Sequence, residues 1–159
     1  MTTYHWYLIL HLVGVFLLVG GAGISTATGV LAGRRNDPKL VEELLGLQIR
    51  TERVVTLPGA AIVLAFGLLL VNEVGFSYTA GWLIAAYVLF ALTLALDFHG
   101  LVPFSRRVRK QAQELSDQGV TESDELRRAA GAPAGAVMGA VLDLVLLAFL
   151  YLMVVKPGA

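Results

Sequence analysis

The sequence predicts an all-α membrane protein, a bundle of four transmembrane helices with short helical extensions on the cytoplasmic side. Hydrophobic residues make up 57% of the 159 residues, charged residues only 15%, and the mean hydropathy is +0.73. An ordinary soluble domain carries about 25% charged residues. The apolar residues also gather into four stretches, each near the roughly 20 residues that a helix needs to cross a bilayer. Both observations favour a chain that resides in lipid.

The four predicted transmembrane helices follow one another and form a single membrane domain. They comprise residues 6–31, 54–71, 80–99 and 134–155. A backbone at membrane depth must satisfy its own hydrogen bonds, so each stretch is expected to be a helix. No lysine or arginine precedes the first stretch, which is also too long for the apolar part of a cleaved signal peptide. The first helix is therefore expected to remain as an anchor.

The positive charges of the chain fall almost entirely in two long loops. All arginines and lysines except Lys156 lie within residues 34–53 and 100–133. Because basic loops stay in the cytoplasm, both loops are expected there, with both termini outside. Tyrosines and tryptophans near the opposite ends of the helices agree, since their rings prefer the membrane interface. The sequence thus predicts a multi-pass protein of the cell (inner) membrane.

Both cytoplasmic loops carry helical signals of their own. Asp37 and Pro38 are typical of an N-cap and a first helical residue, and the helix they begin can run directly into the second transmembrane helix. The stretch "PFSRRVRKQAQEL" extends the third helix as a basic amphipathic segment. Thr121 is expected to cap a further short helix, with Asp124 as the acid of a capping box. The basic segment is expected to be solvated, with anionic lipid or a cytoplasmic partner as the alternative.

The residue types that the chain lacks exclude several kinds of chemistry. There is no cysteine, so the chain has no disulfide, iron–sulfur cluster, thiolate metal site or cysteine nucleophile. No catalytic triad, phosphate-binding loop or nucleic-acid-binding patch is evident, and no metal site is predicted. The first expected partner is the lipid bilayer, and no nucleic acid is expected.

Small residues at four-residue intervals predict how the membrane helices pack. On the first helix they are Gly21, Ser25, Gly29 and Gly33, and on the fourth they are Gly131, Gly135 and Gly139. Such faces allow two helix backbones to approach closely, so a tightly packed bundle is expected. A face left over from this packing could hold a second copy of the chain or another membrane subunit.

Ionisable residues within or near the predicted helices are the candidates for function. They are His11, Asp97, His99, Asp143 and the Glu52/Arg53 pair. Such residues are costly in hydrocarbon and usually serve a purpose or find a partner. Asp97 and His99 are two positions apart, so on a helix they point to nearly opposite sides. At the cytoplasmic rim, Asp97 is expected to form an ion pair with Arg50 or Arg53.

Depth in the membrane separates the remaining candidates. Asp143 lies roughly 13 Å deep, and its expected partners are His11 or the hydroxyls of Ser25, Thr26 and Tyr87. The alternative is a protonated Asp143 that only donates a hydrogen bond. His11 and His99 differ by about 20 Å in depth, so one chain is not expected to hold one metal ion between them.

Three segments carry a resemblance to known membrane proteins. "HLVGVFLLVGG", "RTERVVTLPGAAIVLAFGLLL" and "GWLIAAYVLFALTLALDFHG" are similar to successive segments of small predicted integral membrane proteins of unknown function. These in turn resemble the HemJ-type protoporphyrinogen oxidases and the CopD copper-resistance membrane domain. The shared pattern is a first-helix histidine, a charged start with proline and glycine in the second helix, and a Gly-Trp opening with a terminal histidine in the third. The resemblance to HemJ implies a b-type haem or porphyrin-linked electron transfer that uses His11 and His99.

Three classes of function follow from these features. The expected one is a non-catalytic accessory or self-associating subunit of a membrane complex, because apolar helices with isolated polar residues are more often packed than catalytic. The second is a redox protein that binds haem b or a porphyrin, which the resemblance implies for His11 and His99. The third is a small carrier or proton path through Asp143.

Overall fold

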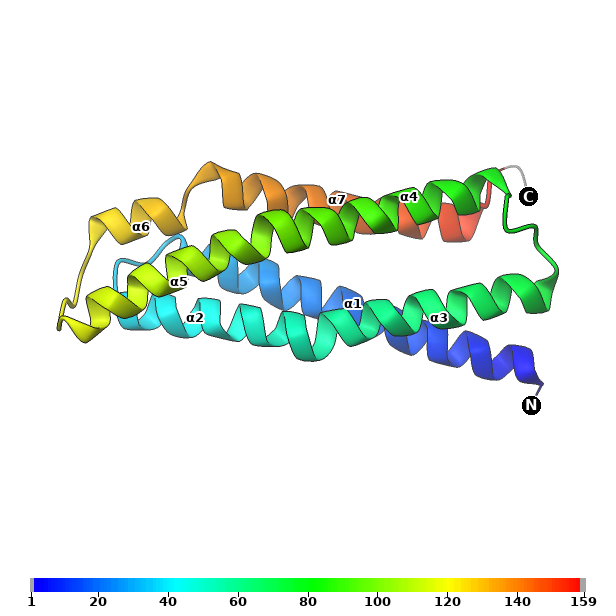
Figure 1. Cartoon of the computed structure of the whole chain (residues 1–159), viewed down its shortest axis with the longest axis horizontal. Coiled ribbons are helices and arrows are strands. Elements are labelled where there is room, and N and C mark those ends of the chain that lie inside the picture. Colours follow the sequence, from blue (N-terminus) through cyan, green and yellow to red (C-terminus); the bar gives the residue numbers. More distant parts are fainter. Residues whose placement is uncertain (1, 158–159) are drawn as a thin grey trace.

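Four long helical rods make up the computed structural model, which describes residues 2–157 (Figure 1). The first rod is α1 (Thr3–Ala32). The second joins α2 (Pro38–Thr51), the π-helical turn η1 (Glu52–Thr56) and α3 (Leu57–Val74). The third joins α4 (Gly81–Leu96), the π-helical turn η2 (Asp97–Leu101) and α5 (Val102–Asp117), and the fourth contains α6 (Asp124–Ala130) and α7 (Pro133–Val155).

All four rods are long and apolar enough to cross a membrane, and residues 2–157 contain no strand. The predicted all-α fold with four membrane-spanning helices is therefore confirmed. The rods are longer than the apolar stretches of the sequence because three of them continue as helix into the polar segments. As predicted, the helix that begins at Pro38 leads into the second membrane-spanning segment, through the π-helical turn η1.

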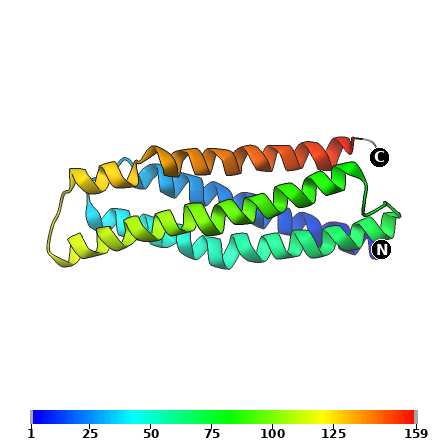
Figure 2. The same ribbon diagram turned by 45° about the horizontal axis from the view of Figure 1, so that its top comes forward.

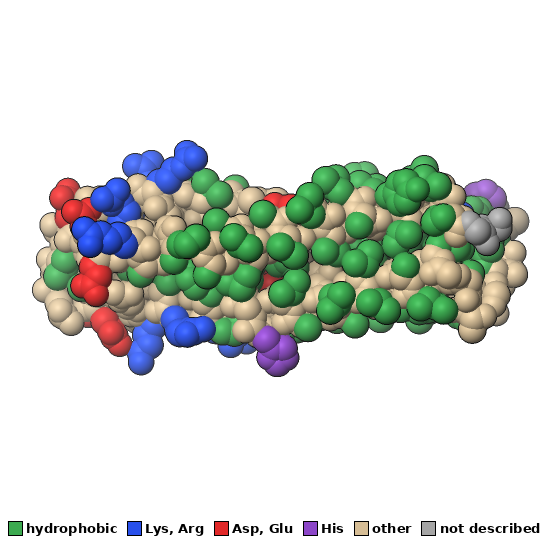
Figure 3. Space-filling view, turned by 90° about the horizontal axis from the view of Figure 1, so that it is seen from above, with side chains coloured by type: hydrophobic (Ala, Val, Ile, Leu, Met, Phe, Trp, Pro, Cys, Tyr) green, Lys and Arg blue, Asp and Glu red, His purple; other side chains and the backbone are tan. Residues whose placement is uncertain are grey.

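The two ends of the molecule differ in charge. The start of α1, the end of α7 and the α3–α4 connection lie at one end, and α2, α5 and α6 form the other (Figure 2). We call this second end, with its loops and the two π-helical turns, the basic end, because it holds every arginine and lysine except Lys156. Figure 3 shows these side chains gathered there. The two long loops thus lie together, as the predicted topology requires.

The first rod packs most closely against α3, where two glycines face each other. A Cβ atom added to Gly14 would lie 2.8 Å from the backbone nitrogen of Val63. One added to Gly59 would lie 2.9 Å from the backbone nitrogen of Leu18. Side chains larger than hydrogen do not fit at such distances, so glycine permits this backbone approach.

The small-residue face of α1 is filled from within the chain. Gly21 packs against the side chain of Thr56 in η1, and Gly33 meets Gly131 at the break between α6 and α7, where an added Cβ would lie 3.1 Å from the Gly131 Cα. Of the other two members, Ser25 is buried and Gly29 points towards Gln48 of the second rod. This face therefore packs within the bundle and leaves little surface for a partner.

The basic end has a small apolar core of its own. Its buried residues come from α1, α2, α5 and α6, and they are Ala32, Val41, Leu45, Val108, Ala112 and Leu126. Leu126 is 0% exposed, so the short helix α6 is held by a side chain that lies entirely inside this core. The core joins α2 to α5, the two helices that adjoin the π-helical turns on the side of the basic end.

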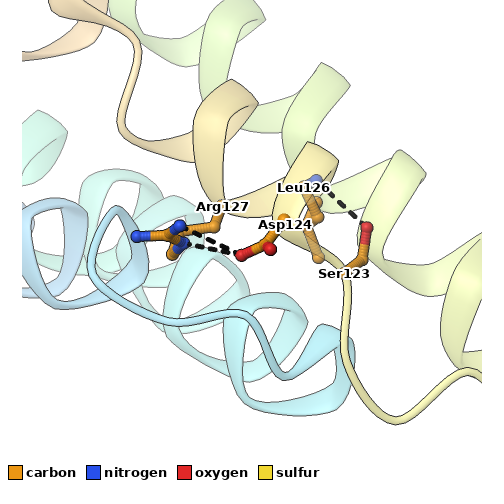
Figure 4. A network of polar contacts seen from close by, with 4 residues as sticks. All are labelled: Ser123, Asp124, Leu126 and Arg127. Carbon is orange, nitrogen blue, oxygen red and sulfur yellow. Dashed lines mark hydrogen bonds and ion pairs between the residues drawn. The ribbon is translucent and has the colours of Figure 1, made fainter.

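The N-terminus of α6 lies two residues later than the sequence predicts. Ser123 is the N-cap in place of Thr121, and its side chain accepts a hydrogen bond from the Leu126 N–H at 3.2 Å (Figure 4). Asp124 is therefore the first helical residue and pairs with Arg127 at 3.0 Å. The Ser123 N–H donates to the carbonyl of Asn36 in the α1–α2 loop, and this contact fixes the cap at residue 123.

Candidate functional site

Two π-helical turns interrupt the second and third rods at matching places. Each begins at an acid and is followed by a proline six residues after that acid, Pro58 after Glu52 and Pro103 after Asp97. Proline has no N–H, and its ring clashes with the carbonyl four residues back, so the regular helix cannot continue through it. In both turns the N–H of the residue before the proline donates to the carbonyl of the acid, five residues back. Such turns are frequent at functional sites.

The two turns bring Glu52 and Asp97 together. Both side chains line the same small cavity, where their carboxyl groups are neighbours. Asp97 is 8% exposed, and Glu52 is half-buried. Two ionised carboxylates at this separation repel each other, and a proton shared between them would remove that repulsion.

A cavity of about 10 Å³ lies beside this acid pair. Its walls include Ser25 from α1, Gln48 from α2 and Ser105 from α5. Ser25 is 7% exposed and Gln48 6%, and neither Ser25 Oγ nor Gln48 Oε1 has a hydrogen-bond partner within residues 2–157. Buried polar atoms without a partner are costly, and a space of this size holds about one water molecule. The cavity thus offers polar contacts to a guest the size of water.

The ion pair expected between Asp97 and Arg50 or Arg53 does not form. Both arginines are exposed, and the ion pairs found among the described residues involve other groups. Successive residues of a helix are about 100° apart around its axis. Because Glu52 points at Asp97, Arg50 and Arg53 point in other directions. An acid therefore occupies the place where a base was expected.

The two candidate haem ligands lie in different surroundings. His11 Nδ1 donates to the Val63 carbonyl at 3.0 Å, and its ring lies over Gly67 of α3. His99 is exposed and lines a groove formed by η2, α5, α6 and α7. The structure does not bring these histidines together, so a haem held by both of them does not fit. Nor do residues 2–157 contain a group of three or more histidine, aspartate or glutamate side chains that could hold a metal ion.

Asp143 is bonded to α1 at the middle of the bundle. Thr26 Oγ1 donates to both of its carboxylate oxygens at 3.3 Å. Of the partners expected from the sequence, Thr26 is thus the one that makes the bond. The neighbouring Ser25 lines the cavity beside the acid pair, so adjacent residues of α1 lie beside the acid pair and Asp143.

A family model described as a predicted integral membrane protein, DUF2269, matches residues 6–157. The chain belongs to this family. The DUF2269 match includes all four rods, both acids of the pair and the residues around the cavity. No curated protein and no solved structure matches the chain. The resemblance to small integral membrane proteins of unknown function is therefore confirmed, and the comparisons give no support to the more distant resemblance to HemJ and CopD.

Proposed function

We propose that this integral membrane protein binds and exchanges a proton at the Glu52–Asp97 pair. The observation that carries the proposal is that two carboxyl groups, one from each of two membrane-spanning rods, line one cavity together with unpartnered polar atoms. Acids placed inside membrane proteins commonly mark proton relays and ion sites. The sequence pointed to Asp143 as the centre of a possible proton path. In this proposal the Glu52–Asp97 pair is the centre instead.

The surrounding residues give each group a role in that proposal. The acid pair holds the proton, and the hydroxyl of Ser25 and the amide oxygen of Gln48 bind a water molecule that carries it to or from the pair. Water-mediated contacts of this kind are nearly as favourable as direct hydrogen bonds. Asp143 is a third acid, to which a proton can pass from the pair. It accepts hydrogen bonds from Thr26, the residue after Ser25 on α1.

Infrared spectroscopy of the purified protein tests for the shared proton. We expect the wild type to show the C=O band of a protonated carboxyl group at neutral pH. The spectrum of the double variant Glu52→Gln, Asp97→Asn is expected to lack part of this band, because neither amide can be a carboxylic acid. The difference between the two spectra isolates the pair from Asp143.

Glu43→Gln is the matched control, since Glu43 is an exposed acid of the same helix α2. Its spectrum is expected to equal that of the wild type in this region. No difference between the wild type and the double variant would show that the pair holds no proton and would overturn the proposal.

We infer a second role, self-association of two copies through α7, which is the accessory or self-associating role expected from the sequence. The 23-residue helix α7 has no buried residue. A Cβ added to Gly139 would meet no described atom within 4 Å, whereas Gly135 of the same helix is covered by Phe104. Small residues at an open helix face allow a second helix to approach closely. We place the assembly in the cell membrane.

Cysteine cross-linking in membranes tests this contact cleanly because the chain has no cysteine of its own. We expect Gly139→Cys to form a disulfide between two copies on mild oxidation. Gly20→Cys is the control, since Gly20 is an equally open glycine of α1. Equal cross-linking of both variants, or none at Gly139→Cys, would contradict self-association through α7.

A further inference from the structure

We propose that the groove beside Arg107 and His99 binds the phosphate headgroup of an anionic phospholipid. This groove has a volume of about 450 Å³ and lies where η2 and α5 meet α6 and the start of α7. None of its lining residues belongs to the acid pair or to the cavity beside it. The proposal is therefore independent of the proton site.

Arg107 supplies the charge for such a ligand. Its Nε donates to the Pro103 carbonyl at 3.4 Å, a bond that orients the guanidinium group along α5. Three other basic residues of this end, Arg109, Lys110 and Arg127, each pair with a carboxylate. Arg107 has no such pair within the described residues, and no acid lines the groove. The planar guanidinium binds phosphate with two parallel hydrogen bonds and is well suited to an anionic oxygen.

The rest of the groove is apolar and held in shape by glycines. Phe104 and Met138 line it. A Cβ added to Gly135 would lie 2.6 Å from the Phe104 ring, and one added to Gly100 would lie 2.7 Å from the Met138 Sδ. The Phe104 and Met138 side chains thus pack directly against glycines of the neighbouring elements, and these contacts hold α5 and η2 against α7. An acyl chain can lie on such walls, whereas a free phosphate ion gains nothing from them.

The position of the groove matches the place of a lipid headgroup. It lies at the border between the start of the apolar helix α7 and the exposed arginines of the basic end. This border between apolar and charged residues corresponds to the membrane interface. Basic pockets between transmembrane helices bind the headgroups of anionic lipids. His99, exposed at the same groove, adds a second hydrogen-bond donor for the phosphate.

Lipid retention measured by native mass spectrometry tests the proposal. The full chain is reconstituted in nanodiscs of phosphatidylcholine with a minor share of phosphatidylglycerol, then released into detergent, and the lipids that stay bound are counted. We expect the wild type to retain phosphatidylglycerol selectively. In Arg107→Gln we expect the selectivity to fall about tenfold, since hydrogen bonds to charged groups are worth about that factor.

Arg106→Gln is the matched control, because Arg106 is the exposed neighbour on α5, loses the same charge and does not line the groove. This variant is expected to keep the selectivity of the wild type, and circular dichroism checks that both variants are folded. An equal loss in both variants would mean general charge attraction and would overturn the site. Displacement of the lipid by inorganic phosphate alone would assign the groove to free phosphate and would also overturn the proposal.

Discussion

Replacement of Asp97 by leucine is expected to lower the free energy of unfolding by about 1–3 kcal/mol, whereas Asp97→Asn should leave it nearly unchanged. Leucine branches at the same carbon atom but has no polar atom, so Glu52 would keep a carboxyl group without its partner. Asparagine retains the contact because its amide donates to a Glu52 carboxylate. Thermal unfolding in detergent, followed by circular dichroism, compares the two variants with the wild type.

The contrast between these variants separates two explanations of Asp97. An ion pair with Arg50 or Arg53 would be lost in both variants, since both remove the charge, and the two losses would then be equal. An acid pair that shares a proton tolerates the amide and not the leucine. Asp117→Leu and Asp117→Asn are the controls at an exposed end of α5, and neither is expected to change stability by more than about 0.5 kcal/mol.

Local signals in the sequence predicted the helices and some of their ends. Asp37 accepts hydrogen bonds from the N–H groups of Lys39 and Leu40, as its position before Pro38 indicates. Such a cap depends only on residues within three positions, so the sequence contains all that is needed. The start of α6 was placed wrongly because the bond from Ser123 to the Asn36 carbonyl joins distant parts of the chain.

The acid pair could not be predicted by the same means. Helical periodicity assumes 3.6 residues per turn, and each π-helical turn adds about one residue and rotates the following side chains by about 100°. The usual pairing of a membrane acid with a base also pointed to the arginines. The sequence does hold one signal, an acid six residues before a proline in both the second and the third helix. This signal indicates an acid pair only once the second and third rods are known to lie next to each other at these two turns.

Replacement of Leu126 by alanine is expected to lower the free energy of unfolding by about 2–5 kcal/mol. Leu126 is 0% exposed and belongs to the apolar core that joins α6 to α1, α2 and α5. The smaller side chain would leave a cavity that this small core cannot refill. Leu147→Ala is the control, since Leu147 of α7 is 61% exposed and its truncation opens no cavity.

Hydrogen exchange locates the effect of Leu126→Ala within the molecule. We expect faster exchange of the backbone amides of α2, α5 and α6, and no change in α3. Because α2 and α5 continue directly into η1 and η2, loosening the core at the basic end also loosens the two turns that hold Glu52 and Asp97. The infrared signal of the shared proton should therefore weaken in Leu126→Ala and persist in Leu147→Ala. A full signal in Leu126→Ala, despite faster exchange in α2 and α5, would show that the membrane-spanning helices alone hold the acid pair.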